Sequence, residues 1–259
     1  MNAALWVSKT GLAAQDTQLR AISNNLANVG TVGFKKDRVV FEDLVYQINQ
    51  QPGGQSSQDS TLPSGIQLGT GVRVSSTQKQ FSIGSLQNTE RSLDMAIEGR
   101  GFFQITLPDG TTGYTRTGSF GLDQNGQIVN SQGYSLEPAI TVPQGTNSLT
   151  IGVDGTVTVV NAGTATQVGS VQLVDFINPA GLEAIGGNLY RETVASGAAF
   201  SSTPGQNGMG EVQQGVLEAS NVSVVEEMVN MVATQRAYEM NARVVSTADQ
   251  MLQYIAQNV

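Results

Sequence analysis

The side chains in this sequence that could carry out chemistry are carboxylates and hydroxyls, because the chain contains neither histidine nor cysteine. A serine nucleophile would lack its usual general base, and neither thiolate nor imidazole is present to bind a metal ion. The motifs G-x-S-x-G and G-x-x-x-x-G-K-[ST] are absent, and the short G-x-G stretches at 69–71 and 99–101 are typical of turns. We therefore expect no enzyme activity and no catalytic, cofactor-binding or metal-binding residues.

The carboxylates fall at positions that favour structural roles. Asp109, Asp123 and Asp154 each lie at or near a glycine in a turn-like stretch, and the spacing of a calcium-binding EF-hand loop is absent. Glu226 and Glu227 would point about 100° apart on a helix, so they do not form a catalytic pair. An enzyme that cleaves glycan through Asp and Glu pairs is a further alternative, but the sequence places no two carboxylates at hydrolase spacing.

The C-terminal stretch 220–259 predicts a long helix. It contains neither Gly nor Pro, and apolar residues recur at steps of three and four from Val225 to Ile255. Ser223 followed by Glu226 is a capping-box pattern, which accounts better for Asn221-Val222-Ser223 than a glycosylation sequon does. A helix from Val224 to about Gln257 would be roughly 50 Å long. Such a helix at a chain end needs a partner along most of its length.

The N-terminal stretch, from Asn2 to about Asn28, predicts the partner helix. A leucine repeats at a spacing of seven, which is the period of a coiled-coil seam, at Leu5, Leu12, Leu19 and Leu26. The positions three residues later include the polar Ser8 and Gln15, so this seam is weak alone and needs an apolar surface. The C-terminal helix is the obvious candidate. An ordinary amphipathic helix packed on its own domain is the alternative.

Between the helices the pattern changes to the period of two that is typical of β-strands. From Asp94 to about Thr203, short alternating runs are separated by turn sequences, of which Asp154-Gly155 is the clearest hairpin signal. About eight or more short strands imply a sandwich-like or barrel-like β domain. The predicted fold class is α+β, with a discontinuous coiled coil of the two terminal helices and an inserted, mainly antiparallel β domain.

The composition limits the possible partners. The 259 residues carry a net charge of −8 and only 13% charged residues, and they contain no basic cluster. This argues against nucleic acid and against the polybasic recognition of anionic membranes. No apolar run is long enough to insert across a bilayer, and the N-terminus lacks the basic and apolar regions of a cleaved secretory signal.

Two motifs at opposite ends of the chain resemble one known family. The stretches SNNLANVGTVGFKKDR, at 23–38, and GVLEASNVSVVEEMVNMVATQRAYEMNARVVSTADQML, at 215–252, are similar to the terminal signatures of bacterial flagellar rod and hook proteins. The signature positions are Asn24, Asn25, Asn28, Gly33, Phe34, Lys35, Ser220, Asn221, Glu226, Glu227, Gln235, Arg236 and Tyr238. Segment 47–70, rich in Gln, Ser, Gly and Pro, resembles an insertion that is typical of distal rod subunits and that hook subunits lack.

The resemblance implies a domain plan. Segments 1–33 and 222–259 are expected to be the helices of an axial coiled-coil core, 34–93 a connecting segment that holds the insertion, 94–203 the outer β domain, and 204–221 the return connector. The insertion is expected to be an extended arm that lies on neighbouring subunits. It has too few apolar residues to order itself, so it should be disordered in the isolated subunit.

The resemblance also implies a function, as a structural subunit that polymerises helically into the distal rod. This rod would be a drive shaft that transmits torque from motor to hook and encloses the export channel. The implied partners are copies of itself, proximal rod subunits, hook-side axial subunits, the P- and L-ring proteins and the flagellar export apparatus. The implied location is the flagellar basal body, from the periplasm to the outer membrane, after export without a cleaved signal peptide.

Three sets of residues are expected to serve assembly. The N-terminal seam comprises Leu5, Leu12, Leu19, Ile22 and Leu26. The C-terminal seam comprises Val225, Met228, Val229, Val232, Tyr238, Met240, Val244, Val245, Met251, Leu252 and Ile255. A polar, uncharged stripe, Ser246, Gln250, Gln253 and Gln257, is expected to face water inside the tube. A solvated outer face is the alternative for this stripe.

Two other interpretations remain. The chain could be a proximal rod or hook-type subunit of the same family, although the 47–70 insertion argues against the hook. It could also belong to another class, as a monomeric secreted binding module with a helical stalk, which would stay monomeric at high concentration. The apolar surface of the C-terminal helix is wider than one helix can cover, and a polymer accounts for that excess where a monomer does not.

Overall fold

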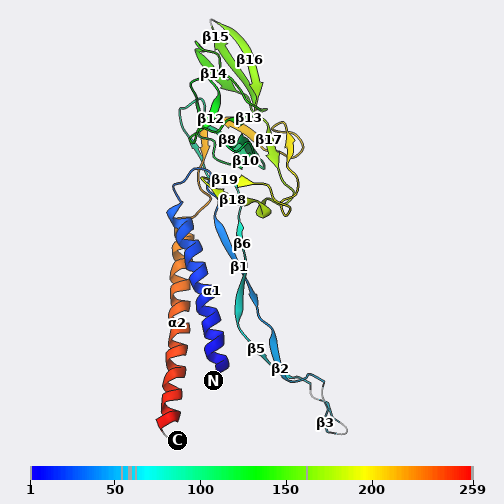
Figure 1. Cartoon of the computed structure of the whole chain (residues 1–259), viewed down its shortest axis with the longest axis vertical. Helices are drawn as coiled ribbons and strands as arrows, with labels where there is room; N and C mark the ends of the chain where they lie inside the picture. Colours follow the sequence, from blue (N-terminus) through cyan, green and yellow to red (C-terminus); the bar gives the residue numbers. More distant parts are fainter. Residues whose placement is uncertain (1, 54, 58–59, 62, 162, 258–259) are drawn as a thin grey trace. The chain divides into compact units, whose positions relative to one another are not determined.

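The computed structural model describes residues 2–53, 55–57, 60–61, 63–161 and 163–257, and it divides into two compact units. Unit 1 comprises Met1–Leu26, Asp37–Gln78 and Ser223–Val259, and unit 2 comprises Ala27–Lys36 and Lys79–Val222. The predicted α+β class is confirmed, because an N-terminal and a C-terminal helix flank many antiparallel strands (Figure 1). Neither helix of the described residues is long and apolar enough to cross a membrane.

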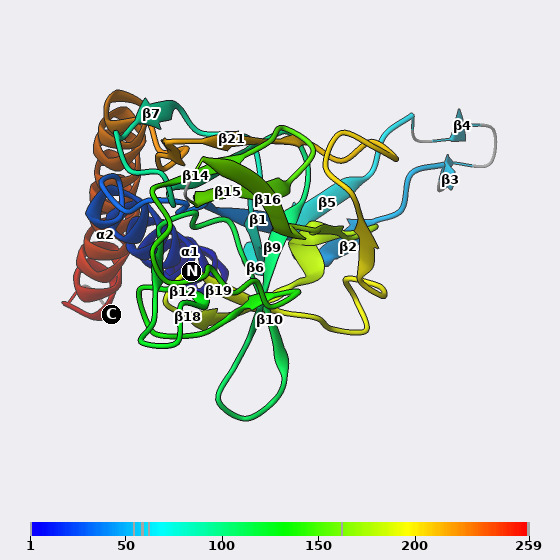
Figure 2. The ribbon, with the colours of Figure 1, turned by 90° about the horizontal axis from the view of Figure 1, so that it is seen from above.

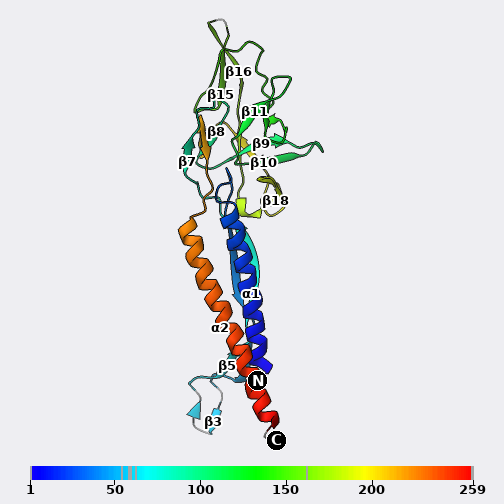
Figure 3. The ribbon, with the colours of Figure 1, turned by 90° about the vertical axis from the view of Figure 1, so that its left-hand side faces the viewer.

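Unit 1 contains both long helices, α1 (Asn2–Ala27) and α2 (Val224–Gln257). They run antiparallel and side by side (Figures 1 and 3). The predicted cap of α2 is present: the Ser223 hydroxyl accepts a hydrogen bond from the Glu226 N–H at 3.5 Å. The Ser223 carbonyl accepts the Glu227 N–H at 3.0 Å, which begins the helical ladder.

A two-stranded ribbon completes unit 1. Strand β1 (Asp37–Asp43) pairs with β6 (Val72–Lys79), and β2 (Tyr46–Gln50) pairs antiparallel with β5 (Ile66–Gly69). The short strands β3 (Gln55–Ser57) and β4 (Ser60–Thr61) follow in the same segment. The described part of insertion 47–70 is therefore largely paired strand, and its residues 54, 58, 59 and 62 lie outside the described residues. Its disorder in the isolated subunit stays a prediction.

Unit 2 is built on a seven-stranded sheet. The strand order is β18 (Glu183–Gly186), β19 (Leu189–Arg191), β10 (Thr112–Thr115), β9 (Phe102–Thr106), β17 (Leu173–Asp175) and β20 (Phe200–Ser202), with β13 (Leu136–Glu137) also on β9. All these pairs are antiparallel. The two sides of this sheet are apolar, with one buried cluster around Phe103 and Ile105 and another around Phe102 and Tyr114.

Smaller sheets surround this one. Strands β14 (Ser148–Ile151), β15 (Thr156–Asn161) and β16 (Thr164–Ser170) lie side by side (Figure 2), and β11 (Phe120–Leu122) pairs with β12 (Ile128–Asn130). The Gly-rich return segment carries β21 (Glu211–Gln214), which pairs with β8 (Met95–Glu98), and β22 (Val216–Glu218), which pairs with β7 (Leu86–Asn88). A 3-10 turn, η1 (Pro179–Gly181), follows β17.

The acidic turn residues have the hairpin role that the sequence predicted. Asp154 lies between β14 and β15, whose register pairs Ile151 with Val157. Its carboxylate accepts the backbone N–H and the hydroxyl of Thr156, and these bonds hold the pKa of Asp154 below its ordinary value. Asp109 accepts the hydroxyl and N–H of Thr111 in the same way, with the same lowering of its pKa. Both carboxylates thus stabilise turns.

Candidate functional site

The carboxylates of the described residues are spread over the fold rather than gathered at one point. Among the residues that the structure describes, no three Asp or Glu side chains are placed to hold a metal ion. The two glutamates at the start of α2 have different surroundings, since Glu226 is exposed whereas Glu227 is buried against α1. The polar residues that the fold does bring together are those of the two terminal motifs, and they form two junctions.

The first junction lies in unit 1 and is centred on Asn25, near the end of α1. The Asn25 side-chain amide accepts the Asp37 N–H at 2.8 Å and donates to the Asp37 carbonyl at 3.0 Å. It also donates to the Glu227 carboxylate at 3.4 Å, and both side chains are buried. One amide therefore ties together α1, the first residue of β1 and the first turn of α2. Only a short side chain with both donors and acceptors can make all of these bonds.

The second junction lies in unit 2 and is centred on a buried ion pair between Lys35 and Glu218. Their Nζ and Oε1 atoms are 2.6 Å apart, and neither side chain is exposed. Lys35 also donates to the Ser82 carbonyl at 2.7 Å, and Glu218 accepts the Gly84 N–H at 2.9 Å. These contacts fasten the segment that follows α1 to the last strand before α2.

A third charged group, Arg116, joins this pair. Its Nε lies 3.1 Å from Oε2 of Glu218, and its side chain is 3% exposed. We call Lys35, Glu218 and Arg116 the buried charge cluster. Burial and the nearby Arg116 hold the pKa of Lys35 below its ordinary value, and Glu218 opposes this shift. Burial likewise lowers the pKa of Arg116, against the pull of Glu218. One carboxylate therefore faces two buried cations.

Asn221 and Gly33 complete the second junction. The Asn221 amide donates to the Gln80 carbonyl at 2.7 Å and accepts the Lys36 N–H at 2.8 Å. The Gly33 N–H donates to the Glu218 carbonyl at 2.7 Å. Gly33 has a φ of 69°, and a Cβ atom there would lie 2.8 Å from the backbone nitrogen of Thr117. Backbone conformation and close packing thus both require glycine at this position.

Gly33→Ala should destabilise unit 2 by about 3 kcal/mol, because the positive φ and the clash with rigid backbone add together. Gly133 is a matched control, since its φ is 85° and no atom lies within 4 Å of its Cβ position. Gly133→Ala should cost only about 1 kcal/mol. Urea unfolding followed by far-UV circular dichroism measures both losses. Equal losses would mean that the close approach to Thr117 does not matter.

The remaining signature residues fall into two groups. Phe34 is buried beneath Lys79, whose Nζ is 5.1 Å from the ring centroid, while Ser220 and Asn28 cap local turns. Asn24 donates to the Asp37 carboxylate at 3.3 Å. A second group, Gln235, Arg236 and Tyr238, lies exposed on α2.

Glu218 and Arg116 were missed by the sequence analysis. The available signal for Glu218 was a lone charge in the apolar stretch Val216-Leu217-Glu218-Ala219.

The interface between α1 and α2 is more polar than the sequence suggested. Its buried members include Ser8, Asn25, Glu227 and Thr234, and Oε1 of Gln18 is buried without a hydrogen-bond partner among the described residues. A Cβ atom on Gly11 would lie 3.1 Å from the Asn241 side chain. These contacts recur every seven residues on both helices and so form one seam, at positions 11, 18 and 25 of α1 and positions 227, 234 and 241 of α2.

The apolar residues expected at helix seams lie mostly outside this contact. In α1, Ile22 is buried and Leu5, Leu12, Leu19 and Leu26 are half-buried. In α2, Val245 is half-buried and the exposed members are Val225, Met228, Val229, Val232, Tyr238, Met240, Val244, Met251 and Leu252. The side chain of Ile255 lies outside the described residues. The stripe Ser246, Gln250, Gln253 and Gln257 is also exposed. Whether these surfaces serve assembly stays a prediction.

Comparison with known proteins supports the resemblance along the whole chain. Residues 5–35 match the family of flagella basal body rod proteins, 96–159 the D1 domain of flagellar hook proteins FlgE/F/G, and 213–258 the C-terminal domain of flagellar basal body rod FlgEFG proteins. The flagellar basal-body rod protein FlgG of Buchnera aphidicola subsp. Schizaphis graminum is 54% identical over 98% of both chains. The FlgG proteins of Borreliella burgdorferi and Bacillus subtilis are 46% and 39% identical, over 97% and 96% of both chains. The chain belongs to the FlgG family of flagellar basal-body rod proteins.

Proposed function

We propose that this chain is a structural, non-catalytic subunit that polymerises helically into the distal rod of the flagellar basal body. The observation that carries this proposal is the exposed apolar face of α2, which extends from Val225 to Leu252 on the 34-residue helix. A monomer gains nothing from so large an apolar surface, whereas a polymer buries it in every copy. Contacts that repeat head to tail without closing into a ring generate a filament.

The polar seam between α1 and α2 fits the same proposal. Buried Ser, Asn, Thr and Glu side chains specify which residues of the two helices lie opposite one another, but they contribute little hydrophobic stabilisation. The helices of an isolated chain would therefore be marginally stable and would become rigid only among other copies. A rod that transmits torque from motor to hook needs such a large, repeated interface.

The ribbon of unit 1 supplies a second surface for neighbours. In its outer part, Tyr46, Ile48, Ile66 and Leu68 are all exposed. A two-stranded ribbon with exposed apolar side chains is marginal in water. We place this arm against adjacent subunits, where those side chains would be covered and would stiffen the shaft.

The proposed partners are copies of this chain, proximal rod subunits, hook-side axial subunits, the P- and L-ring proteins around the rod and the export apparatus that delivers the chain. The proposed route is flagellar export without cleavage of a signal peptide. Electron microscopy of basal bodies from a strain that lacks this protein tests the role. We expect them to lack the distal rod and the hook, and basal bodies with a normal rod and hook would overturn the proposal.

If the polar stripe of α2 lines the central channel of the rod, a negative charge placed on it should slow the export of later subunits. The stripe at Ser246, Gln250, Gln253 and Gln257 is polar, uncharged and exposed. In a helical tube, Gln250→Glu would repeat one charge in every copy and create a strong field on passing chains. We expect hook proteins and filament proteins to be secreted several-fold more slowly. Gln250→Asn, which stays neutral, is the control. Normal secretion through a rod of Gln250→Glu subunits would mean that the stripe does not face the channel.

A further inference from the structure

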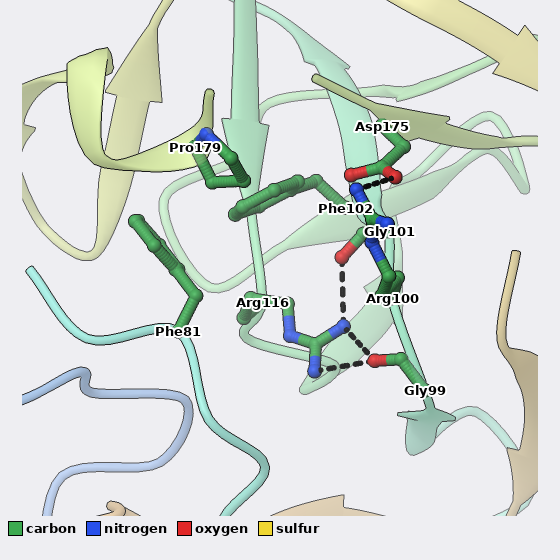
Figure 4. A pocket seen from close by; sticks show the side chains of 8 residues that line it. All are labelled: Phe81, Gly99, Arg100, Gly101, Phe102, Arg116, Asp175 and Pro179. Carbon is green, nitrogen blue, oxygen red and sulfur yellow. Dashed lines mark hydrogen bonds and ion pairs between the residues drawn. The ribbon is translucent and has the colours of Figure 1, made fainter. Parts of the chain in front are cut away.

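Unit 2 contains a cavity of about 300 Å³ beside the buried charge cluster. Its apolar lining is formed by Phe81, Phe102 and Pro179, and its polar lining by Arg116, Arg100 and Asp175 (Figure 4). The rings of Phe81 and Phe102 meet edge to face, with centroids 5.2 Å apart. The Arg100 guanidinium lies 2.9 Å from the Asp175 carboxylate and is largely exposed. The cavity thus combines aromatic walls with two cationic side chains.

The buried Arg116 has two N–H groups without a hydrogen-bond partner among the described residues. Its Nη1 donates to the carbonyls of Gly99 and Gly101 at 3.0 and 2.7 Å, and its Nη2 donates to the Gly99 carbonyl at 3.0 Å (Figure 4). Its Nε lies 3.1 Å from Oε2 of Glu218 as an ion pair, but neither atom has a hydrogen-bond partner among the described residues. The Nε–H and the second N–H on Nη2 thus lack an acceptor among the described residues, and a buried donor without a partner is costly.

The charges around the cavity do not balance. Arg100 is paired with Asp175, but Lys35 and Arg116 share the single carboxylate of Glu218. One excess positive charge is therefore held away from water. An anion at Arg116 would balance this charge and accept one of the unpaired N–H groups. Because Phe81, Phe102 and Pro179 form the apolar part of the wall, the chemistry that fits is a carboxylate carried on an apolar stem.

We propose that this cavity receives the carboxylate of an Asp or Glu side chain from a second copy of this chain. This inference rests on the proposed function, which places copies side by side. The chain carries 21 acidic and 13 basic residues, so a neighbouring copy presents an excess of carboxylates. Asp175 and Pro179 both line the cavity, and Ile177, which lies between them in the sequence, is 91% exposed, as expected of a side chain that a docked copy would cover.

Titration of the full-length monomer with phenylacetate tests the chemistry, with 2-phenylethanol as the uncharged counterpart. Phenylacetate should shift the amide NMR signals of Gly99, Gly101 and Arg116, and the alcohol should bind at least about tenfold more weakly because it lacks the charge. Arg100→Gln should weaken phenylacetate binding about threefold. Arg191→Gln is the matched control, since Arg191 forms an exposed ion pair with Glu183 at the same 2.9 Å, away from the cavity.

Self-association of the full chain, measured by sedimentation, tests the source of the carboxylate. Phenylacetate should raise the protein concentration needed for self-association, whereas 2-phenylethanol should leave it unchanged. Arg100→Gln should also raise that concentration, and Arg191→Gln should not. Equal binding of acid and alcohol would overturn the carboxylate site. Phenylacetate binding with unchanged self-association would overturn the second copy as its source. If the wild-type protein does not self-associate at any concentration, the proposed function as a polymer subunit is contradicted. The NMR titration would still show whether the cavity binds a carboxylate.

Discussion

Glu218→Gln is expected to lower the free energy of unfolding by about 3–5 kcal/mol, although the two side chains have nearly the same shape. Glu218 is fully buried between Lys35, at 2.6 Å, and Arg116, at 3.1 Å. Glutamine keeps an oxygen for the Gly84 N–H but removes the only negative charge of the buried charge cluster. Two cations would then be buried side by side without a counter-charge.

Lys35→Met should cost less, about 1–2 kcal/mol, because it removes hydrogen bonds but leaves a balanced pair. Arg116 and Glu218 still face each other after this change, and methionine fills much of the space of the lysine stem. Comparing the loss of unfolding free energy in Glu218→Gln with that in Lys35→Met distinguishes two explanations of how the buried charge cluster stabilises the fold. If charge balance decides, Glu218→Gln is the more harmful change. If the number of hydrogen bonds decides, the two changes cost similar amounts.

The pH dependence gives an independent readout of the same cluster. Burial and Arg116 hold the pKa of Lys35 in the folded protein below its ordinary value. Between the lowered pKa and the ordinary one, the unfolded chain binds more protons than the folded chain, so Lys35 makes stability rise with pH in that window. The advantage of the wild type over Lys35→Met should therefore grow from neutral pH towards about pH 10.

Urea unfolding of the wild type and both variants at a series of pH values measures these effects. Tyr114, whose pKa is raised by burial, also titrates at alkaline pH, but it is common to all three proteins and its contribution cancels in the differences. A wild-type advantage over Lys35→Met that shrinks with rising pH would contradict the lowered pKa. Equal losses for the two variants at neutral pH would contradict the charge-balance argument.

The helices and the hairpin turns could be predicted from the sequence because their determinants are local. An uninterrupted 3.6-residue period and the Ser223 cap define α2, which runs from Val224 to Gln257 as expected. Asp154-Gly155 forms its hairpin because Asp154 bonds the backbone two residues ahead. The terminal signature pointed to Asn25, Gly33 and Lys35 as special positions. Each of these lies in one of the two junctions.

The partners of these residues could not be predicted, because they depend on contacts between distant parts of the chain. Lys35 meets Glu218 across 183 positions, and nothing near Arg116 in the sequence indicates that it is buried in the same cluster. Hydrophobic periodicity also located an apolar face on α2 without showing what covers it. The contact with α1 uses the polar face through Glu227 and Thr234, which leaves the apolar face open.

Val229→Asp on that open face is expected to abolish polymerisation while leaving the monomer folded. Val229 is 63% exposed in the single chain, so the substitution should change monomer stability by no more than about 0.5 kcal/mol. In a polymer that packs this face, every copy would bury an unpaired carboxylate, at a cost of several kcal/mol per copy. Motility and the number of complete basal bodies, in a strain that makes only the variant, measure the loss.

Val153→Asp is the matched control because it makes the same change at a residue of unit 2 that is 60% exposed. It adds the same charge and removes the same apolar side chain, so any general effect on solubility, export or folding appears in both variants. We expect the Val153→Asp strain to assemble rods and swim. A Val229→Asp strain with normal rods would show that α2 packs through another face. Equal loss in both strains would mean that added charge, rather than its position on α2, prevents assembly. If the polymer buries the open face of α2, rod assembly should be lost in the Val229→Asp strain alone.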